Sequence, residues 1–139
     1  MNFPYVEFLG LAEERIFRPM IPITFKANNH IFQTYALVDS GSDYSILPIE
    51  IAGKLNLKLA DQPQYNIQGA GGSSFTIYKS QLKVEHTLQK RGFRDIKWSS
   101  FVYFDESGTT LLLGQKGFLD RFQINLNGPQ KGIEILQSA

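Results

Sequence analysis

The stretch ALVDSGSDYSIL, residues 36–47, places a carboxylate at the end of an apolar run. Asp39 follows three apolar residues and precedes Ser40 and Gly41, and apolar residues resume at Ile46. Asp-Ser-Gly is ordinary turn chemistry, because Asp bonds to neighbouring backbone and Gly adopts unusual φ angles. By itself the tripeptide indicates only a turn, and any further meaning depends on the rest of the chain.

The composition indicates one packed domain. The chain has 139 residues, of which 42% are hydrophobic and 19% charged, with a net charge of +1 and no cysteine. The size suits a single core, the charge argues against binding nucleic acid through its phosphates, and disulfides are impossible.

The first residues do not resemble a signal peptide, and no apolar run is long enough to span a membrane. Because the two histidines lack metal-ligand spacing, we expect no metal or cofactor, and we predict a cytoplasmic protein with no nucleic-acid or membrane partner.

Short apolar-alternating segments separated by turn residues dominate the chain, which is typical of β-strands. We predict strands over 20–27, 31–39, 64–68, 74–79, 80–88, 96–104, 109–114, 122–127 and 132–136. Two short helices are predicted, over 48–56, where proline and asparagine suit the two ends, and over 115–122. The pattern as a whole predicts one mainly antiparallel β domain.

The order of four features resembles the retropepsin-like aspartic proteases. A strand ends in Asp-Ser-Gly, a glycine-rich turn follows, then an apolar-apolar-glycine element, and finally a short helix and a strand. The segments ALVDSGSDYSILP and LLLGQKGFLDRF carry the resemblance most specifically, and it extends from about Arg18 to Leu136. It implies a mainly β fold, a retropepsin-like closed antiparallel β-barrel with a glycine-rich flap hairpin. Residues 1–17 would be an N-terminal leader or strand, and residues 18–139 the protease domain.

The resemblance implies an aspartic endopeptidase that acts on a peptide or protein substrate. Hydrolysis of a peptide bond by water needs a base and an acid, and two carboxyl groups that share one proton supply both. The chain contains a single Asp-Ser-Gly. The second carboxyl must therefore come from a second copy of the chain, so we expect a homodimer in which Asp39 of each copy meets its partner.

The resemblance also assigns roles to other residues. The catalytic loop is Asp39, Ser40 and Gly41, where the serine hydroxyl bonds across the dimer. The substrate-binding residues would be Asp43, Ser42, Ile46, Ile67, Leu112 and the flap tip Gly69, Ala70, Gly71 and Gly72. The residues that support the site or the dimer would be Arg18, which pairs with Asp43 across the dimer, and Leu113 and Gly114, which pack beneath the catalytic loop.

Four features distinguish this chain from many retroviral relatives. Gln115 stands where those relatives carry arginine, so an ion pair is not expected there. The additional strand over 132–136 and the leader resemble cellular or bacterial members. Ser42 places a hydroxyl beside Asp39, and we expect it to donate a hydrogen bond to the carboxylate, which would favour the ionised pair and move activity toward acidic pH.

Two other classes of function compete with the endopeptidase. One is a non-catalytic peptide-binding or dimerisation module on the same fold, because a fold does not decide function. The other is a small β-barrel that binds nucleic acid, which the near-neutral charge disfavours. The intact Asp-Ser-Gly, its apolar surroundings and the glycine-rich hairpin favour the endopeptidase.

Overall fold

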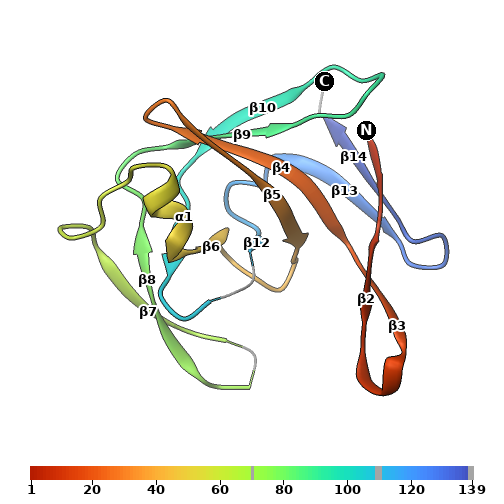
Figure 1. The fold of residues 1–139 in the computed structure, drawn as a ribbon, viewed down its shortest axis with the longest axis horizontal. Helices are drawn as coiled ribbons and strands as arrows, with labels where there is room; N and C mark the ends of the chain where they lie inside the picture. The colour runs from red at the N-terminus through yellow and green to blue at the C-terminus, as the bar shows by residue number, and fades with distance from the viewer. Residues whose placement is uncertain (70, 109–110, 138–139) are drawn as a thin grey trace.

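The computed structural model describes residues 1–69, 71–108 and 111–137 and shows a mainly β protein, as predicted (Figure 1). The strands are β1 (Asn2–Pro4), β2 (Val6–Leu9), β3 (Arg15–Arg18), β4 (Met20–Ala27), β5 (His30–Val38), β6 (Ile46–Pro48), β7 (Gln64–Gln68), β8 (Ser74–Lys79), β9 (Val84–Leu88), β10 (Ile96–Ser100), β11 (Tyr103–Asp105), β12 (Leu112–Leu113), β13 (Phe122–Asn127) and β14 (Gly132–Gln137). The helical segments are the 3₁₀ turn η1 (Leu11–Glu13) and helix α1 (Ile49–Lys54).

One curled sheet carries the fold. Within the described residues its strand order is β10-β9-β4-β5-β12-β6-β11-β8-β7. Most neighbouring strands are antiparallel, whereas β12 runs parallel to β5 and β11 runs parallel to β6. The sheet curls into a half-barrel around the apolar core (Figure 1). Because β12 lies between β5 and β6, a segment late in the chain fills the middle of a sheet that earlier segments build.

The β4–β5 hairpin follows the predicted pattern. In β4 the side chains of Ile21, Ile23 and Phe25 are buried and their neighbours are more exposed, which is the period of two expected for a strand with one face on the core. The turn residues Asn28 and Asn29 have φ angles of 51° and 62°. Asparagine tolerates this left-handed region, so the turn closes the hairpin as predicted.

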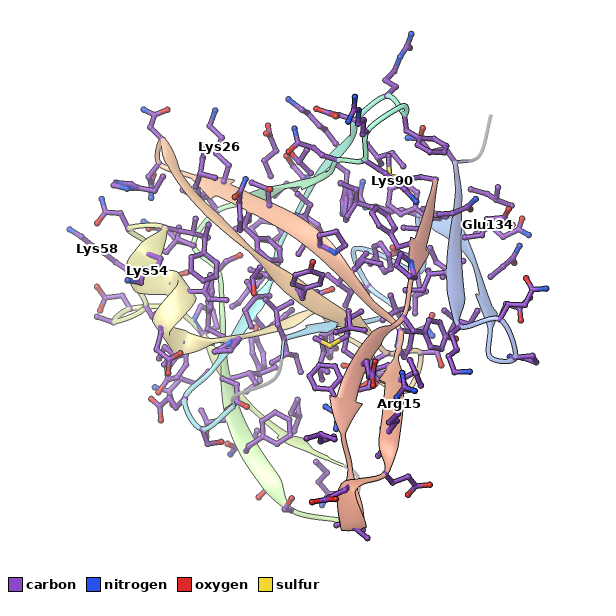
Figure 2. All side chains as sticks on the ribbon, turned by 45° about the vertical axis from the view of Figure 1, so that its right-hand side comes forward. Arg15, Lys26, Lys54, Lys58, Lys90 and Glu134 are labelled. Carbon is purple, nitrogen blue, oxygen red and sulfur yellow. The ribbon has the colours of Figure 1, made fainter. Side chains whose placement is uncertain are left out.

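The N-terminal segment joins the protein body in two ways. Strand β1 pairs with β14, and β14 also pairs with β13, so the two chain ends share a three-stranded sheet. Strands β2 and β3 form a separate hairpin that extends from the body (Figure 1). Arg15 of this hairpin, labelled in Figure 2, donates a hydrogen bond of 2.5 Å to Glu7 on the paired strand.

The helix predicted over 115–122 is not formed. The segment consists of consecutive turns, in which Leu119 N–H donates to the Gly114 carbonyl and Asp120 N–H to the Gln115 carbonyl. Gly117 has a φ angle of 90°, outside the right-handed helical region, and its carbonyl accepts a hydrogen bond from the Trp98 indole. A tertiary contact therefore overrides the local helical pattern. In the part of the chain that the structure describes, no helix is long and apolar enough to cross a membrane.

A buried histidine lies inside the aromatic part of the core. His86 on β9 is 1% exposed, and its ring lies between Phe25 and Trp98, with ring centroids 5.0 and 4.9 Å away. Its Nδ1 is 2.8 Å from the Val84 carbonyl oxygen, and its buried Nε2 has no partner among the described residues. Burial, with a smaller contribution from the positive charge of Arg121, lowers the pKa of His86 from 6.5 to about 4.

We predict that this histidine makes folding sensitive to acid. The unfolded chain binds a proton at His86 near pH 6.5 and the folded chain only near pH 4, so stability decreases as the pH falls through this window. As the pH falls through this window, the unfolding free energy of the wild type should decrease by up to about 3 kcal/mol relative to that of His86→Phe. Urea unfolding at several pH values measures this difference. The matched control is His30→Phe, which replaces an exposed histidine of β5 in the same way. A constant difference for His86→Phe would contradict the prediction.

Candidate active site

Asp39 is held at the point where β5 leaves the sheet. Its N–H donates to the Leu113 carbonyl at 3.0 Å, and the preceding Val38 N–H donates to the Pro19 carbonyl at 2.9 Å. Leu113 is fully buried beneath this point, where the sequence analysis expected it. The main chain is therefore fixed from both sides, and the half-buried side chain of Asp39 leaves the strand at a defined place.

The residues after Asp39 form a tight loop around its carboxyl group. Gly41 N–H donates to Asp39 Oδ1 at 2.9 Å, and Ser42 N–H donates to the Asp39 carbonyl at 3.2 Å. A Cβ atom on residue 41 would lie 3.3 Å from Asp39 Oδ1, which is a tight contact. Glycine at this position thus allows the backbone to approach and bind one oxygen of the carboxyl group, while Ser40 is exposed beside it.

Ser42 does not bind Asp39 as expected. Its Oγ donates to the Tyr44 carbonyl at 2.7 Å. A hydroxyl group has one hydrogen to donate, so in this arrangement it is committed to the loop backbone. The expectation that Ser42 stabilises the ionised carboxylate is therefore wrong, because a local side chain–backbone bond competes successfully for the hydroxyl.

The segment after β12 packs its backbone directly against the Asp39 loop (residues 39–45). A Cβ atom on residue 114 would lie 2.3 Å from the Tyr44 carbonyl oxygen and 2.5 Å from the Ser42 carbonyl oxygen. The adjacent Gln115 N–H donates to the Ser42 carbonyl at 2.9 Å. The N–H of Gly114 itself donates to Ser45 Oγ at 3.2 Å. Only glycine fits at position 114, and its approach lets main-chain bonds hold the loop.

Gln115 has a role that the sequence analysis did not assign. Its Nε2 donates to the Ser40 carbonyl at 2.9 Å. The residue was noted only because it replaces an arginine found in retroviral relatives. In this chain a neutral side chain secures the exposed part of the loop without an ion pair.

A cleft of about 290 Å³ opens beside the Asp39 carboxyl group. It is lined by Asp39, Gly41, Ser42, Asp43, Tyr44, Ile46, Ile67, Gln68, Gly69, Phe75 and Leu112. Eight of these were predicted, and Tyr44, Gln68 and Phe75 were not. A larger hollow of about 360 Å³ lies over β4 and β5, but no Asp or Glu lines it. Of these two hollows, only the smaller one is therefore lined by carboxyl groups.

The β7–β8 hairpin forms one wall of this cleft. The end of the hairpin next to its turn contributes Ile67, Gln68 and Phe75, and Gly69 N–H donates to the Ser73 carbonyl at 2.9 Å. Gly71 and Gly72 have φ angles of 91° and 84°, which other residues rarely adopt. Ala70 lies outside the described residues. The hairpin extends from the same end of the molecule as the β2–β3 hairpin (Figure 1).

Arg18 does not line the cleft. Its guanidinium carbon lies 4.7 Å from the centre of the Phe8 ring, within the β2–β3 hairpin. Asp43, the expected partner across a dimer, is exposed at the cleft. Within one copy of the chain, the arginine thus packs on an aromatic ring rather than on a carboxylate.

A tyrosine cluster adjoins the cleft at Tyr44. The Tyr44 and Tyr103 ring centroids are 4.8 Å apart, and the Tyr65 and Tyr103 centroids are 6.1 Å apart. Burial, assisted by the two neighbouring tyrosines, raises the pKa of Tyr103 above its ordinary value of 10. At neutral pH its hydroxyl group therefore stays protonated.

Comparison with known proteins places these features in a family. A family model described as "Aspartyl protease" matches residues 23–116. A retropepsin-like aspartic protease from Rickettsia conorii is structurally similar, with a TM-score of 0.60, 17% identity, and 98% of each chain covered. EIAV protease in complex with an inhibitor gives a TM-score of 0.48 and 21% identity, covering 81% of this chain and 93% of that chain. A comparison with curated proteins finds no match.

We predict that Gly114→Ala destabilises the protein strongly. The added methyl group would overlap two backbone carbonyl oxygens that cannot move without breaking the loop. The expected loss of unfolding free energy is at least about 2 kcal/mol, as for other overpacked sites. Denaturant unfolding measures it.

The matched control is Gly53→Ala in α1. A Cβ atom there would contact nothing within 4 Å, and alanine is a better helix former than glycine. This variant should gain roughly 0.5–1 kcal/mol. Equal effects of the two substitutions would show that the backbone contact at Gly114 does not constrain the loop.

Proposed function

Because this chain belongs to the aspartyl protease family, we propose that it is an endopeptidase that acts as a homodimer. Asp39 of each copy would supply one of two carboxyl groups that together activate a water molecule. The observation that carries the proposal is the Asp39 loop, which presents one half-exposed carboxyl group at a cleft of about 290 Å³. One such loop per chain makes half of a two-carboxyl site.

The proposed reaction is hydrolysis by an acid and a base of the same chemical type. Two carboxyl groups held close together do not both ionise, so the pair carries one proton. The carboxylate takes a proton from water, whose oxygen attacks the carbonyl carbon, and the protonated partner supplies a proton to the departing nitrogen as the C–N bond breaks. Two carboxyl groups that share one proton are established for aspartic proteases as a class.

The cleft supports a peptide substrate with apolar side chains beside the scissile bond. Ile46, Ile67 and Leu112 present apolar surface there, while Asp43 offers a carboxylate for the backbone of the substrate. The β7–β8 hairpin would close over the bound peptide as a flap and exclude water. Glycines at its tip allow the backbone to take the conformations that such closure needs.

Two residues outside the cleft would act across the dimer. Ser40 is exposed on the Asp39 loop, so its hydroxyl group is available to a second copy. Arg18 is also exposed, and we place it opposite Asp43 of the second copy. Both assignments depend on the two loops meeting at a twofold axis.

We predict that Asp39→Asn abolishes cleavage without unfolding the protein. An amide cannot exchange the catalytic proton, but its oxygen still accepts the Gly41 N–H bond that shapes the loop. The loss of kcat/KM on a peptide library should be several orders of magnitude, with the circular dichroism spectrum unchanged. Peptide binding with no cleavage by the wild type would instead favour the non-catalytic peptide-binding module.

Mixing the two proteins tests whether the site is shared between copies. In an exchanging mixture of wild type with a ninefold excess of Asp39→Asn, nearly all wild-type subunits sit in mixed dimers. Activity per wild-type subunit should then fall to about one tenth, with sedimentation showing dimers throughout. Unchanged activity in the mixture, or an active monomer, would contradict the shared site.

We predict that Ser42→Ala leaves the pH dependence of cleavage unchanged. The hydroxyl group is bonded to the Tyr44 carbonyl rather than to Asp39, so its removal does not alter the charge balance of the two carboxyls. The measurement is kcat/KM against pH for both proteins on one peptide. A shift of both limbs of the profile toward higher pH would show that Ser42 binds the carboxylate in the dimer.

A further inference from the structure

A second, basic cleft adjoins the tyrosine cluster. It has a volume of about 230 Å³ and is lined by Lys79, Lys83, Ser100, Phe101, Tyr103, Lys116, Gly117, Asp120 and Arg121. Four of these side chains are cationic and one is anionic. Asp120 is already engaged, because its Oδ1 accepts the Gly117 N–H at 3.0 Å.

Two of the four cations of this basic cleft lie at an exposed aromatic ring. Lys79 Nζ lies 4.4 Å and Lys83 Nζ 5.9 Å from the centre of the Phe101 ring, which is 36% exposed. Among the described residues, the only ion pair joins Arg15 to Glu7, so no carboxylate lies within ion-pair distance of these lysines. Like charges close together are unfavourable, and an anionic ligand would relieve that repulsion.

The sheet register makes the basic cleft a continuation of the candidate active site. Lys79 on β8 is directly opposite Tyr103 on β11, and Tyr103 is directly opposite Ile46 on β6. Ile46 in turn is opposite Leu112 on β12. Directly opposed residues project from the same face of a sheet. A single row of side chains therefore runs from the Asp39 cleft, through Tyr103, to the cations.

We propose that the basic cleft binds an acidic side chain of the substrate and so selects which peptides are cleaved. This inference rests on the proposed endopeptidase function. Three strand spacings separate Leu112 from Lys79, roughly 14 Å in a sheet. An extended peptide advances about 3.3 Å per residue, so a Glu or Asp about four residues from the scissile bond reaches the cations.

Paired peptides test the proposal. They share one apolar scissile sequence and carry Glu or Gln at one position, three to five residues from the scissile bond on either side. At the position that reaches the basic cleft, the kcat/KM of the wild type should be about tenfold higher for the Glu peptide than for the Gln peptide, mainly because KM is lower. This difference should be smaller at high salt. Equal cleavage of the two peptides at every position would overturn the proposal.

Charge variants test whether Lys79 and Lys83 cause the preference for the Glu peptide. Lys79→Gln/Lys83→Gln should reduce the preference for Glu to about twofold or less, and Lys79→Glu/Lys83→Glu should prefer a peptide with Lys at that position. The matched control is Lys54→Gln/Lys58→Gln, which removes two exposed lysines on and after α1 (Figure 2) and should keep the wild-type preference. A preference that survives the Lys79/Lys83 variants, or is lost in the control, would contradict the proposal.

A binding measurement separates this inference from the proposed function. Fluorescence anisotropy of the labelled Glu and Gln peptides on Asp39→Asn reports recognition without chemistry. Tighter binding of the Glu peptide, lost in the Lys79/Lys83 variants, would support the basic cleft even if wild type cleaved nothing. If the wild type cleaves both peptides and Asp39→Asn binds them equally, the result would support the endopeptidase function and contradict the proposed role of the basic cleft.

Discussion

The backbone contact between Gly114 and the carbonyl groups of Ser42 and Tyr44 is the constraint on which the site depends. It leaves no space for a side chain, and the main-chain bonds of Gly114 and Gln115 hold the Asp39 loop from below. The same approach positions β12 between β5 and β6. The place of the carboxyl group and the order of the central strands are thus consequences of one close contact between two distant parts of the chain.

Several elements could be predicted from the sequence because their signals are local. Apolar residues alternate with others from Ile21 to Ala27 in β4, an asparagine turn follows, and the short helix after β6 begins after a proline. The turns over 115–122 could not be predicted, since they depend on a tertiary contact in which the Trp98 indole donates a hydrogen bond to the Gly117 carbonyl. The hydrogen bonds of Ser42 and Gln115 could not be predicted either. Each of these polar side chains has several possible acceptors, and only the folded loop determines which one it binds.

The candidate site and the basic cleft differ in how much of each the sequence reveals. The Asp39 loop is contiguous and matches a family pattern, so its residues could be named in advance. Lys79, Lys83 and Arg121 come from separate segments, and each alone is an ordinary surface charge. Only the register of β8, β11, β6 and β12 brings the lysine of β8 into line with the apolar side chains of the Asp39 cleft.

The pairing of β1 with β14 has a consequence for how the protein folds. The partners are more than 120 residues apart in the sequence, and Phe3 of β1 is buried in the folded protein. Pairs so far apart must close a long loop, which costs chain entropy and slows folding. Until that loop closes, β14 has one unpaired edge, and an unpaired strand edge favours aggregation.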